Sequence, residues 1–202
     1  MREGFVYLDN ALPGVFWDAK YASADNFTGA AVPGYLASRV VGTSEMAAAL
    51  GTAQNLAAER GFGLLLWDGY RPQRAVDGFL RWAASPEDGR TKAKHYPGID
   101  KADIVPLGYV AARSGHSRGS AIDLTLCDLR TGKPADMGGD FDLMDIRSHH
   151  GAEGVPLEAA WNREALRLIM EACGFSAYAC EWWHYSLRNE PYPGQYFDFP
   201  IE

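Results

Sequence analysis

The stretch Ser114-Gly115-His116-Ser117-Arg118-Gly119-Ser120-Ala121-Ile122-Asp123 places a histidine and an aspartate seven residues apart, with a glycine between them. Imidazole nitrogen and carboxylate oxygen both suit zinc. Gly119 permits a turn or a bulge, because glycine adopts positive φ without steric cost. We therefore predict that His116 and Asp123 converge on one metal ion from neighbouring extended segments.

A second motif, Glu181-Trp182-Trp183-His184-Tyr185, places a glutamate three residues before another histidine. Positions i and i+3 of a regular strand face opposite sides, so Glu181 and His184 share one site only if a turn or bulge comes just before the strand. The neighbouring aromatic side chains would exclude water and strengthen electrostatic interactions.

Together the two motifs supply two histidines and one carboxylate as ligands, His116, Asp123 and His184. Such a set leaves a coordination position open for water, as in catalytic zinc sites. Zinc lowers the pKa of that water to about 7, and Glu181 is then free to act as the catalytic base. The spacing of His116 and Asp123 alone is weak, since an isolated histidine or aspartate in a loop is usually structural.

The residues on either side of the first motif predict secondary structure. Apolar residues recur on one helical face after Thr43-Ser44-Glu45 and stop before Gly61, which predicts a helix. Gly63–Trp67 is a short apolar run typical of a buried strand, and Asp68–Pro72 is the turn after it. Ala75–Ala84 is expected to form a second helix, with Pro72 near its first turn.

The rest of the chain is less regular. We expect a strand at Ala121–Leu126, a helix at Trp161–Cys173 and a last strand at Trp183–Leu187. Residues 1–40, 85–112 and 128–155 are expected to be mainly irregular, and His95, His149 and His150 there are given structural roles. This order predicts a single α+β domain over residues 1–202, with helices packed on a small, mainly antiparallel sheet that carries the zinc site.

Composition limits the classes of partner. The 202 residues carry a formal net charge of −7, and an acidic surface repels phosphate backbones, so nucleic acid is not expected. No run approaches the roughly 20 apolar residues of a membrane span. The first residues, MREGFVYLDN, lack the apolar core of a secretion signal, so we expect a cytoplasmic protein. Cys127, Cys173 and Cys180 are odd in number and are expected to be buried free thiols.

At these motifs the sequence resembles the zinc D-Ala-D-Ala peptidases, and most closely the D-alanyl-D-alanine dipeptidases of the vancomycin-resistance (VanX) type. The resemblance runs along nearly the whole chain. Segments that carry it are Asp18–Ala22, Asp25–Gly29, Leu64–Pro72, Ser117–Leu126, Arg147–His150 and Glu181–Tyr185. It implies one zinc ion per chain at His116, Asp123 and His184, with Glu181 as base. It also implies that Arg71 stabilises the transition state; an ion pair at the start of a helix is the structural alternative for that residue.

A free dipeptide is a zwitterion, so a dipeptidase must hold an ammonium and a carboxylate. The acidic stretch Asp140-Phe141-Asp142 could bind the ammonium, and the resemblance favours Asp142; a loop cap is the alternative. Ser114, with nearby backbone N–H groups, could receive the carboxylate. Tyr21 and Tyr35 are candidates for the wall of the pocket.

The expected function is hydrolysis of D-Ala-D-Ala by a cytoplasmic enzyme. The resemblance implies a role in depleting a cell-wall precursor and so in resistance to glycopeptides such as vancomycin. Two alternatives remain: a related peptidoglycan D,D-carboxypeptidase or endolysin, and a non-catalytic zinc-binding recognition module. The expected partner is a small dipeptide, and a homodimer is possible.

Overall fold

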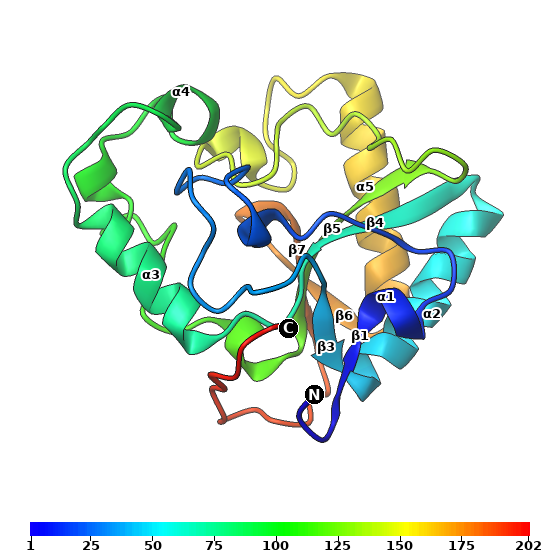
Figure 1. The fold of residues 1–202 in the computed structure, drawn as a ribbon. Helices are drawn as coiled ribbons and strands as arrows, with labels where there is room; N and C mark the ends of the chain where they lie inside the picture. The colour runs from blue at the N-terminus through cyan, green and yellow to red at the C-terminus, as the bar shows by residue number, and fades with distance from the viewer.

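A five-stranded sheet organises the chain in the computed structural model, which describes residues 1–202. The strand order is β2-β4-β5-β7-β6; β2 runs parallel to β4, and every other pairing is antiparallel. The strands are β2 (Phe16–Trp17), β4 (Phe62–Asp68), β5 (Ala121–Asp128), β6 (Phe175–Tyr178) and β7 (Glu181–Leu187). The predicted α+β fold with a mainly antiparallel sheet is confirmed (Figure 1).

A small antiparallel ribbon of β1 (Phe5–Tyr7) and β3 (Val41–Thr43) accompanies this sheet. The α-helices are α1 (Leu8–Ala11), α2 (Ser44–Glu59), α3 (Gln73–Ala83), α4 (Lys92–His95) and α5 (Leu157–Ala172). Short 3-10 turns are η1 (Lys20–Ala22), η2 (Lys101–Asp103), η3 (Gly115–Arg118) and η4 (Ile146–Ser148). No helix is both long and apolar enough to cross a membrane.

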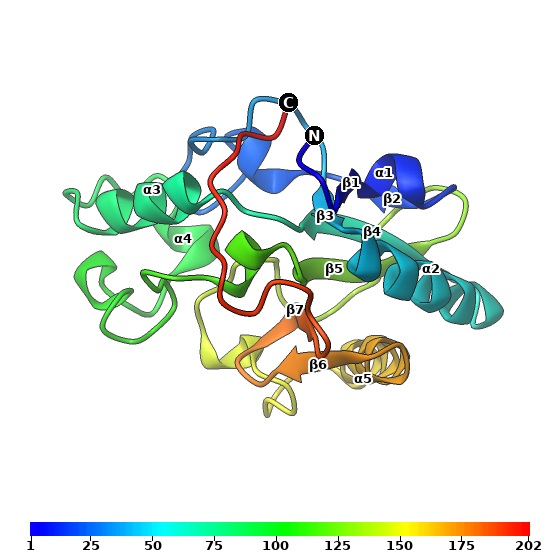
Figure 2. The ribbon, with the colours of Figure 1, turned by 90° about the horizontal axis from the view of Figure 1, so that it is seen from below.

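The two long helices, α2 and α5, pack against each other and against the sheet, while α3 and α4 lie at the other end of the molecule (Figure 2). Helix α2 begins where the Thr43 hydroxyl accepts a hydrogen bond from the Met46 N–H. Its buried face includes Met46, Leu50 and Ala53, three residues of the main hydrophobic core.

The regular elements match the predictions where they are long. Helix α2 and strand β4 lie where the sequence places them, and α3 begins two residues early. Helix α5 begins at Leu157 rather than at Trp161. Both side chains are exposed, 66% and 67%, and Ala159 is the one buried residue of the first turn of α5, so the apolar stripe that marks a helix in sequence is weak there. The region 85–112, expected to be irregular, contains α4 and η2, which are too short to show a period.

The cysteines are all free, as expected, but only Cys127 is buried. Cys173 and Cys180 are partly exposed, so the prediction of buried thiols is wrong for these two. Cys173 follows the last turn of α5, and Cys180 lies in the tight connection between β6 and β7, where little chain is available to cover it.

The two ends of the chain lie side by side, and the Tyr7 hydroxyl donates to the Glu202 backbone carbonyl at 2.6 Å (Figures 1 and 2). The C-terminal segment, red in the figures, reaches this point by crossing the turns that follow β4 and precede β5. The Phe197 N–H donates to the Ser117 carbonyl at 2.8 Å, and the Phe197 carbonyl accepts from the Gln73 N–H at 3.0 Å. This one residue therefore ties η3 to the start of α3.

Gly119 ends η3 in the left-handed region, with φ of 79°, just before β5. A Cβ at this position would overlap the ring of Phe5, which is itself packed among Tyr70, Phe197 and Phe199. Both the backbone conformation and the space thus require glycine here.

We predict that Gly119→Ala lowers the free energy of unfolding by about 3 kcal/mol, combining left-handed strain with overpacking. The matched control is Gly61→Ala. Gly61 has φ of 83° but open space around its α-carbon, so only the strain of about 1 kcal/mol applies. Urea unfolding of both variants measures the difference. Equal losses would show that the contact with Phe5 is unimportant.

Candidate active site

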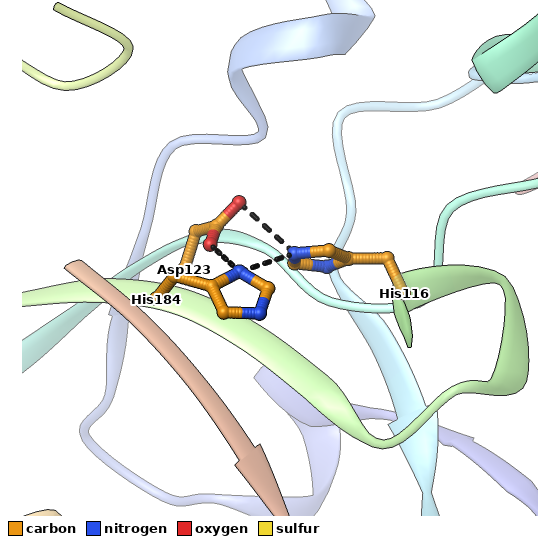
Figure 3. A group of neighbouring side chains, drawn as sticks. All are labelled: His116, Asp123 and His184. Carbon is orange, nitrogen blue, oxygen red and sulfur yellow. Dashed lines mark hydrogen bonds and ion pairs between the residues drawn. The ribbon is translucent and has the colours of Figure 1, made fainter. Parts of the chain in front are cut away.

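The pairing of β5 with β7 sets Asp123 directly opposite His184. Residues that face each other across antiparallel strands have their side chains on the same side of the sheet. The His184 Nδ1 lies 3.0 Å from the Asp123 Oδ1. Two of the predicted ligands therefore come from one cross-strand pair, whose geometry the sheet fixes (Figure 3).

The third ligand, His116, lies on η3 immediately before β5. The Ser114 hydroxyl caps this turn by accepting from the His116 N–H at 3.2 Å, and Gly119 ends it. The His116 Nε2 lies 3.3 Å from the Asp123 Oδ2 and 3.1 Å from the His184 Nδ1. The prediction that both ligands of this motif lie on extended segments is wrong for His116, because the cap favours a tight turn.

The hydrogen bonds of the histidines leave a suitable nitrogen facing the centre of the group. The His116 Nδ1 lies 2.7 Å from the Gly69 carbonyl, to which it can donate only as N–H. Its Nε2 then carries the lone pair that a metal needs. The His184 Nδ1 faces the same centre, while its Nε2 lies 3.5 Å from the Ser186 hydroxyl on the far side of the ring.

These donor atoms fit a metal ion. All three lie within 4.8 Å of one another, and the residues are buried or nearly so. Burial raises the pKa of Asp123, but the two histidines outweigh it and hold that pKa below its ordinary value, so the ligand is a carboxylate. Two imidazoles and one carboxylate form a donor set of the catalytic zinc type, with room for a further ligand.

Glu181 lies beside the three ligands, with its Oε2 3.8 Å from the His184 Nδ1. It is the first residue of β7, and the register of β6 against β7 shifts between Ala177 and Tyr178, next to its partner position. This is the kind of irregularity that the three-residue spacing requires. Burial raises the pKa of Glu181 to about 7, and the neighbouring His184 opposes that rise.

Arg71 enters the site from the turn after β4. Its guanidinium is held by Asp68, through Nε at 2.8 Å, and by Asp123, through Nη2 at 3.2 Å. The remaining nitrogen, Nη1, has no acceptor in the protein. Burial lowers the pKa of Arg71, but the two carboxylates outweigh it, so the group stays charged. Arg71 therefore does form the ion pair that was the structural alternative, and its Nη1 nitrogen still has no acceptor in the protein.

A cavity of about 310 Å³ opens over these groups. It is lined by Arg71, His116, Asp123, Glu181 and His184, and three predicted substrate-binding residues, Ser114, Asp142 and Tyr21, also line it.

Tyr35 does not reach this cavity. It is buried behind Arg71, and its hydroxyl donates to the Asp68 Oδ1 at 2.6 Å. Its place in the pocket wall is therefore not supported. The hydrogen bond with the buried Asp68 carboxylate draws the ring inward and gives Tyr35 a part in orienting Arg71.

Asp142 has an unusual backbone: its φ of 58° makes it the single non-glycine residue with positive φ. The Tyr21 hydroxyl donates to its Oδ2 at 2.8 Å. No backbone N–H donates to its side chain, so the loop-cap alternative gains no support. Burial raises the pKa of Asp142 well above its usual range, and Asp123 adds to the rise. A positive charge brought next to this carboxyl would therefore be favourable.

Comparison with known proteins gives a consistent picture. A family profile described as D-ala-D-ala dipeptidase matches residues 1–202. The chain is similar to proteins named D-alanyl-D-alanine dipeptidase from Streptomyces coelicolor, at 63% identity, and from Enterococcus faecium, at 58%, both over 100% of each chain. A protein of that name from Escherichia coli is 38% identical over 84% of this chain and 77% of its own.

The chain belongs to the D-Ala-D-Ala dipeptidase family. The predicted resemblance is thereby confirmed over the full length of the chain. The predicted zinc cofactor is confirmed by the family together with the converging group of His116, Asp123 and His184.

Two parts of this dipeptidase-family site were missed by the sequence. Asp68, which orients Arg71, was read only as a turn residue, although a buried carboxylate at the end of an apolar strand is an unusual placement. The Gly69 carbonyl, which fixes the tautomer of His116, gives no signal in sequence because every residue carries a carbonyl.

We predict that His116→Ala lowers the zinc content of the purified protein well below that of the wild type, because two ligands hold zinc poorly. Elemental analysis after dialysis measures this. His149→Ala is the control, since His149 lies outside the ligand group. An unchanged zinc content in His116→Ala would contradict the assignment of the ligand.

Proposed function

We propose that this chain is a zinc-dependent dipeptidase that hydrolyses D-Ala-D-Ala. The observation that carries the proposal is the convergence of His116, Asp123 and His184, with the Glu181 carboxylate 3.8 Å from a ligand nitrogen. The names of the relatives at 63% and 58% identity support the substrate.

Glu181 is the proposed general base. A zinc ion held by the three ligands supplies Lewis acidity, which polarises a peptide carbonyl and makes water acidic near neutral pH. Glu181 takes a proton from the attacking water as the new C–O bond forms, and gives that proton to the leaving amine as the C–N bond breaks. A carboxyl whose pKa is raised to about 7 suits both transfers.

Arg71 is the proposed electrostatic stabiliser. Asp68 and Asp123 fix two nitrogens of its guanidinium, and the Arg71 side chain lines the cavity. A charged donor fixed in this way can meet the oxygen that becomes negative in the tetrahedral intermediate, without reorganising during the reaction.

The two ends of the dipeptide are assigned to opposite charges in the cavity. Asp142, supported by Tyr21, would receive the ammonium, and the arriving positive charge would favour the carboxylate form of Asp142. The Ser114 hydroxyl uses its oxygen to cap η3, so its hydrogen remains free to donate to the substrate carboxylate.

The biological role proposed from the resemblance is depletion of a cell-wall precursor, which supports resistance to glycopeptides. No specific observation favours the carboxypeptidase or endolysin alternative, since the cavity is small. None favours the recognition module either, because Glu181 and Arg71 both line the cavity and a module that only binds zinc does not need them. A cytoplasmic location and a homodimer stay predictions of the sequence.

We predict that Glu181→Gln keeps its zinc but loses about 10²–10⁴-fold in kcat, because an amide cannot accept the proton. Steady-state kinetics together with elemental analysis measure both quantities. Glu153→Gln, which changes an exposed glutamate, is the matched control. Near wild-type turnover in Glu181→Gln would mean that another group is the base.

We predict that N-acetyl-D-Ala-D-Ala is cleaved about 10²-fold less efficiently, in kcat/KM, than free D-Ala-D-Ala, because acetylation removes the ammonium and leaves Asp142 without its partner. L-Ala-L-Ala serves as the stereochemical control. Robust cleavage of the N-blocked dipeptide would sink the dipeptidase proposal and favour a carboxypeptidase.

A further inference from the structure

Arg163, on helix α5, is a buried cation without an acidic partner. Its side chain is only 4% exposed, and no aspartate or glutamate lies within ion-pair distance of it. One of its nitrogens, Nη2, is buried with no acceptor at all. Burying a guanidinium in this way is unfavourable, since buried charges are normally paired with an opposite charge. The contacts of Arg163 should therefore explain why a charged side chain is buried here.

The acceptors of Arg163 are backbone carbonyls at the two ends of one segment. Its Nε donates to the Met137 carbonyl at 2.6 Å. Its Nη1 donates to the Arg147 carbonyl at 2.7 Å and to the His149 carbonyl at 3.3 Å. The planar guanidinium can make these bonds at once because its donors form a rigid fork. Arg163 therefore clips together the start and the end of residues 137–149, here called the 137–149 segment.

The 137–149 segment has little regular structure of its own, apart from the short turn η4. It carries Asp142, whose positive φ is a conformation that persists only where its surroundings enforce it. One side of the segment is fixed by His95, whose Nδ1 lies 3.2 Å from the Asp142 carbonyl and whose own carbonyl accepts from the Met144 N–H at 2.7 Å. Arg163 fixes the segment from the side of α5.

The guanidinium is also packed in place. It lies over the ring of Trp182, with its central carbon 5.6 Å from the ring centre, and Trp182 directly follows Glu181. Gly139 also lies close to it, and a Cβ added there would stand 3.6 Å from the Arg163 Nη2. The position of Arg163 is therefore defined by β7 and by the 137–149 segment together, so it relates the strand that carries Glu181 to the segment that carries Asp142.

We propose that Arg163 is a positioning residue that holds Asp142 in place to receive the ammonium end of the dipeptide. This inference rests on the proposed function, since it assigns Arg163 a part in substrate recognition. Arg163 does not line the catalytic cavity and does not contact the metal ligands. All of its side-chain hydrogen bonds go to the 137–149 segment, so we expect it to act mainly through that segment. Its loss should therefore weaken binding of the substrate without affecting the reaction of bound substrate.

The test compares Arg163→Met and Arg163→Lys with Arg188→Met. Arg188 is a matched control because it too donates to two carbonyls, those of Phe175 and Glu171, but lies away from the 137–149 segment. For D-Ala-D-Ala we expect Arg163→Met to raise KM about 10-fold to 100-fold, with kcat within about threefold and with full zinc content. Arg163→Lys, which keeps the charge but not the fork, should raise KM less. Arg188→Met should leave KM unchanged.

Two further readouts separate positioning from a general structural role. Amide hydrogen exchange should accelerate in residues 137–149 of the Arg163 variants, but not in the Arg188 variant. In an Asp142→Asn background, Arg163→Met should raise KM no further, because the group it positions is already lost.

The proposal is overturned if KM rises by the same factor in both backgrounds, or if exchange in the segment is unchanged. Should Arg163→Met fail to fold, Arg163→Lys decides: wild-type KM and exchange in that variant would contradict the role of the fork. If the wild type itself does not cleave D-Ala-D-Ala, the proposed function fails. Hydrogen exchange then still tests whether Arg163 holds the 137–149 segment in place.

Discussion

The register of β5 against β7 is the constraint on which the rest of the site depends. It sets Asp123 opposite His184, and strand geometry then brings their side chains together on one face. A slip of one residue in either strand would turn that strand's ligand to the other face of the sheet. Two local irregularities bring the other functional residues to this pair. The tight turn ending at Gly119 returns His116 to the start of β5, and the shift between β6 and β7 brings Glu181 to the side of His184.

A second constraint is the balance of buried charge. Asp68 and Asp123 are both almost completely buried, and Arg71 lies between them. One guanidinium cannot neutralise two carboxylates, so the group keeps a net negative charge where the dielectric constant is low. Such a site favours a cation among its ligands. Strand β4 makes this arrangement possible, because its register against β5 shifts after Leu66 and sets Asp68 opposite Asp123. Metal binding and the orientation of Arg71 thus share one electrostatic origin.

Long periodic segments and residue chemistry could be predicted from the sequence, whereas short elements and backbone contacts could not. Helix α2 shows its period clearly, and strand β4 shows an unbroken apolar run. The ligand types, with the spacing of Glu181 and His184, indicated a zinc site. The strands β1, β3 and β6 contain three or four residues and show no period. The aromatic ring of Tyr35 suggested a place in the wall of the substrate pocket. The direction of its side chain depends instead on the hydrogen bond to Asp68, which the sequence does not reveal. The substrate preference came from resemblance, since side-chain types alone do not describe the shape of a cavity.

The contacts of the C-terminal segment have a consequence for how the protein is made. Synthesis proceeds from the N-terminus, and His184, the last ligand, follows most of the 202 residues. The η3 turn that carries His116 gains its contact with Phe197 later still. A growing chain on the ribosome therefore holds no finished metal site. The three ligands come together only where β5 and β7 pair, so the metal site needs the assembled sheet. In small zinc-finger domains, by contrast, the metal itself drives folding.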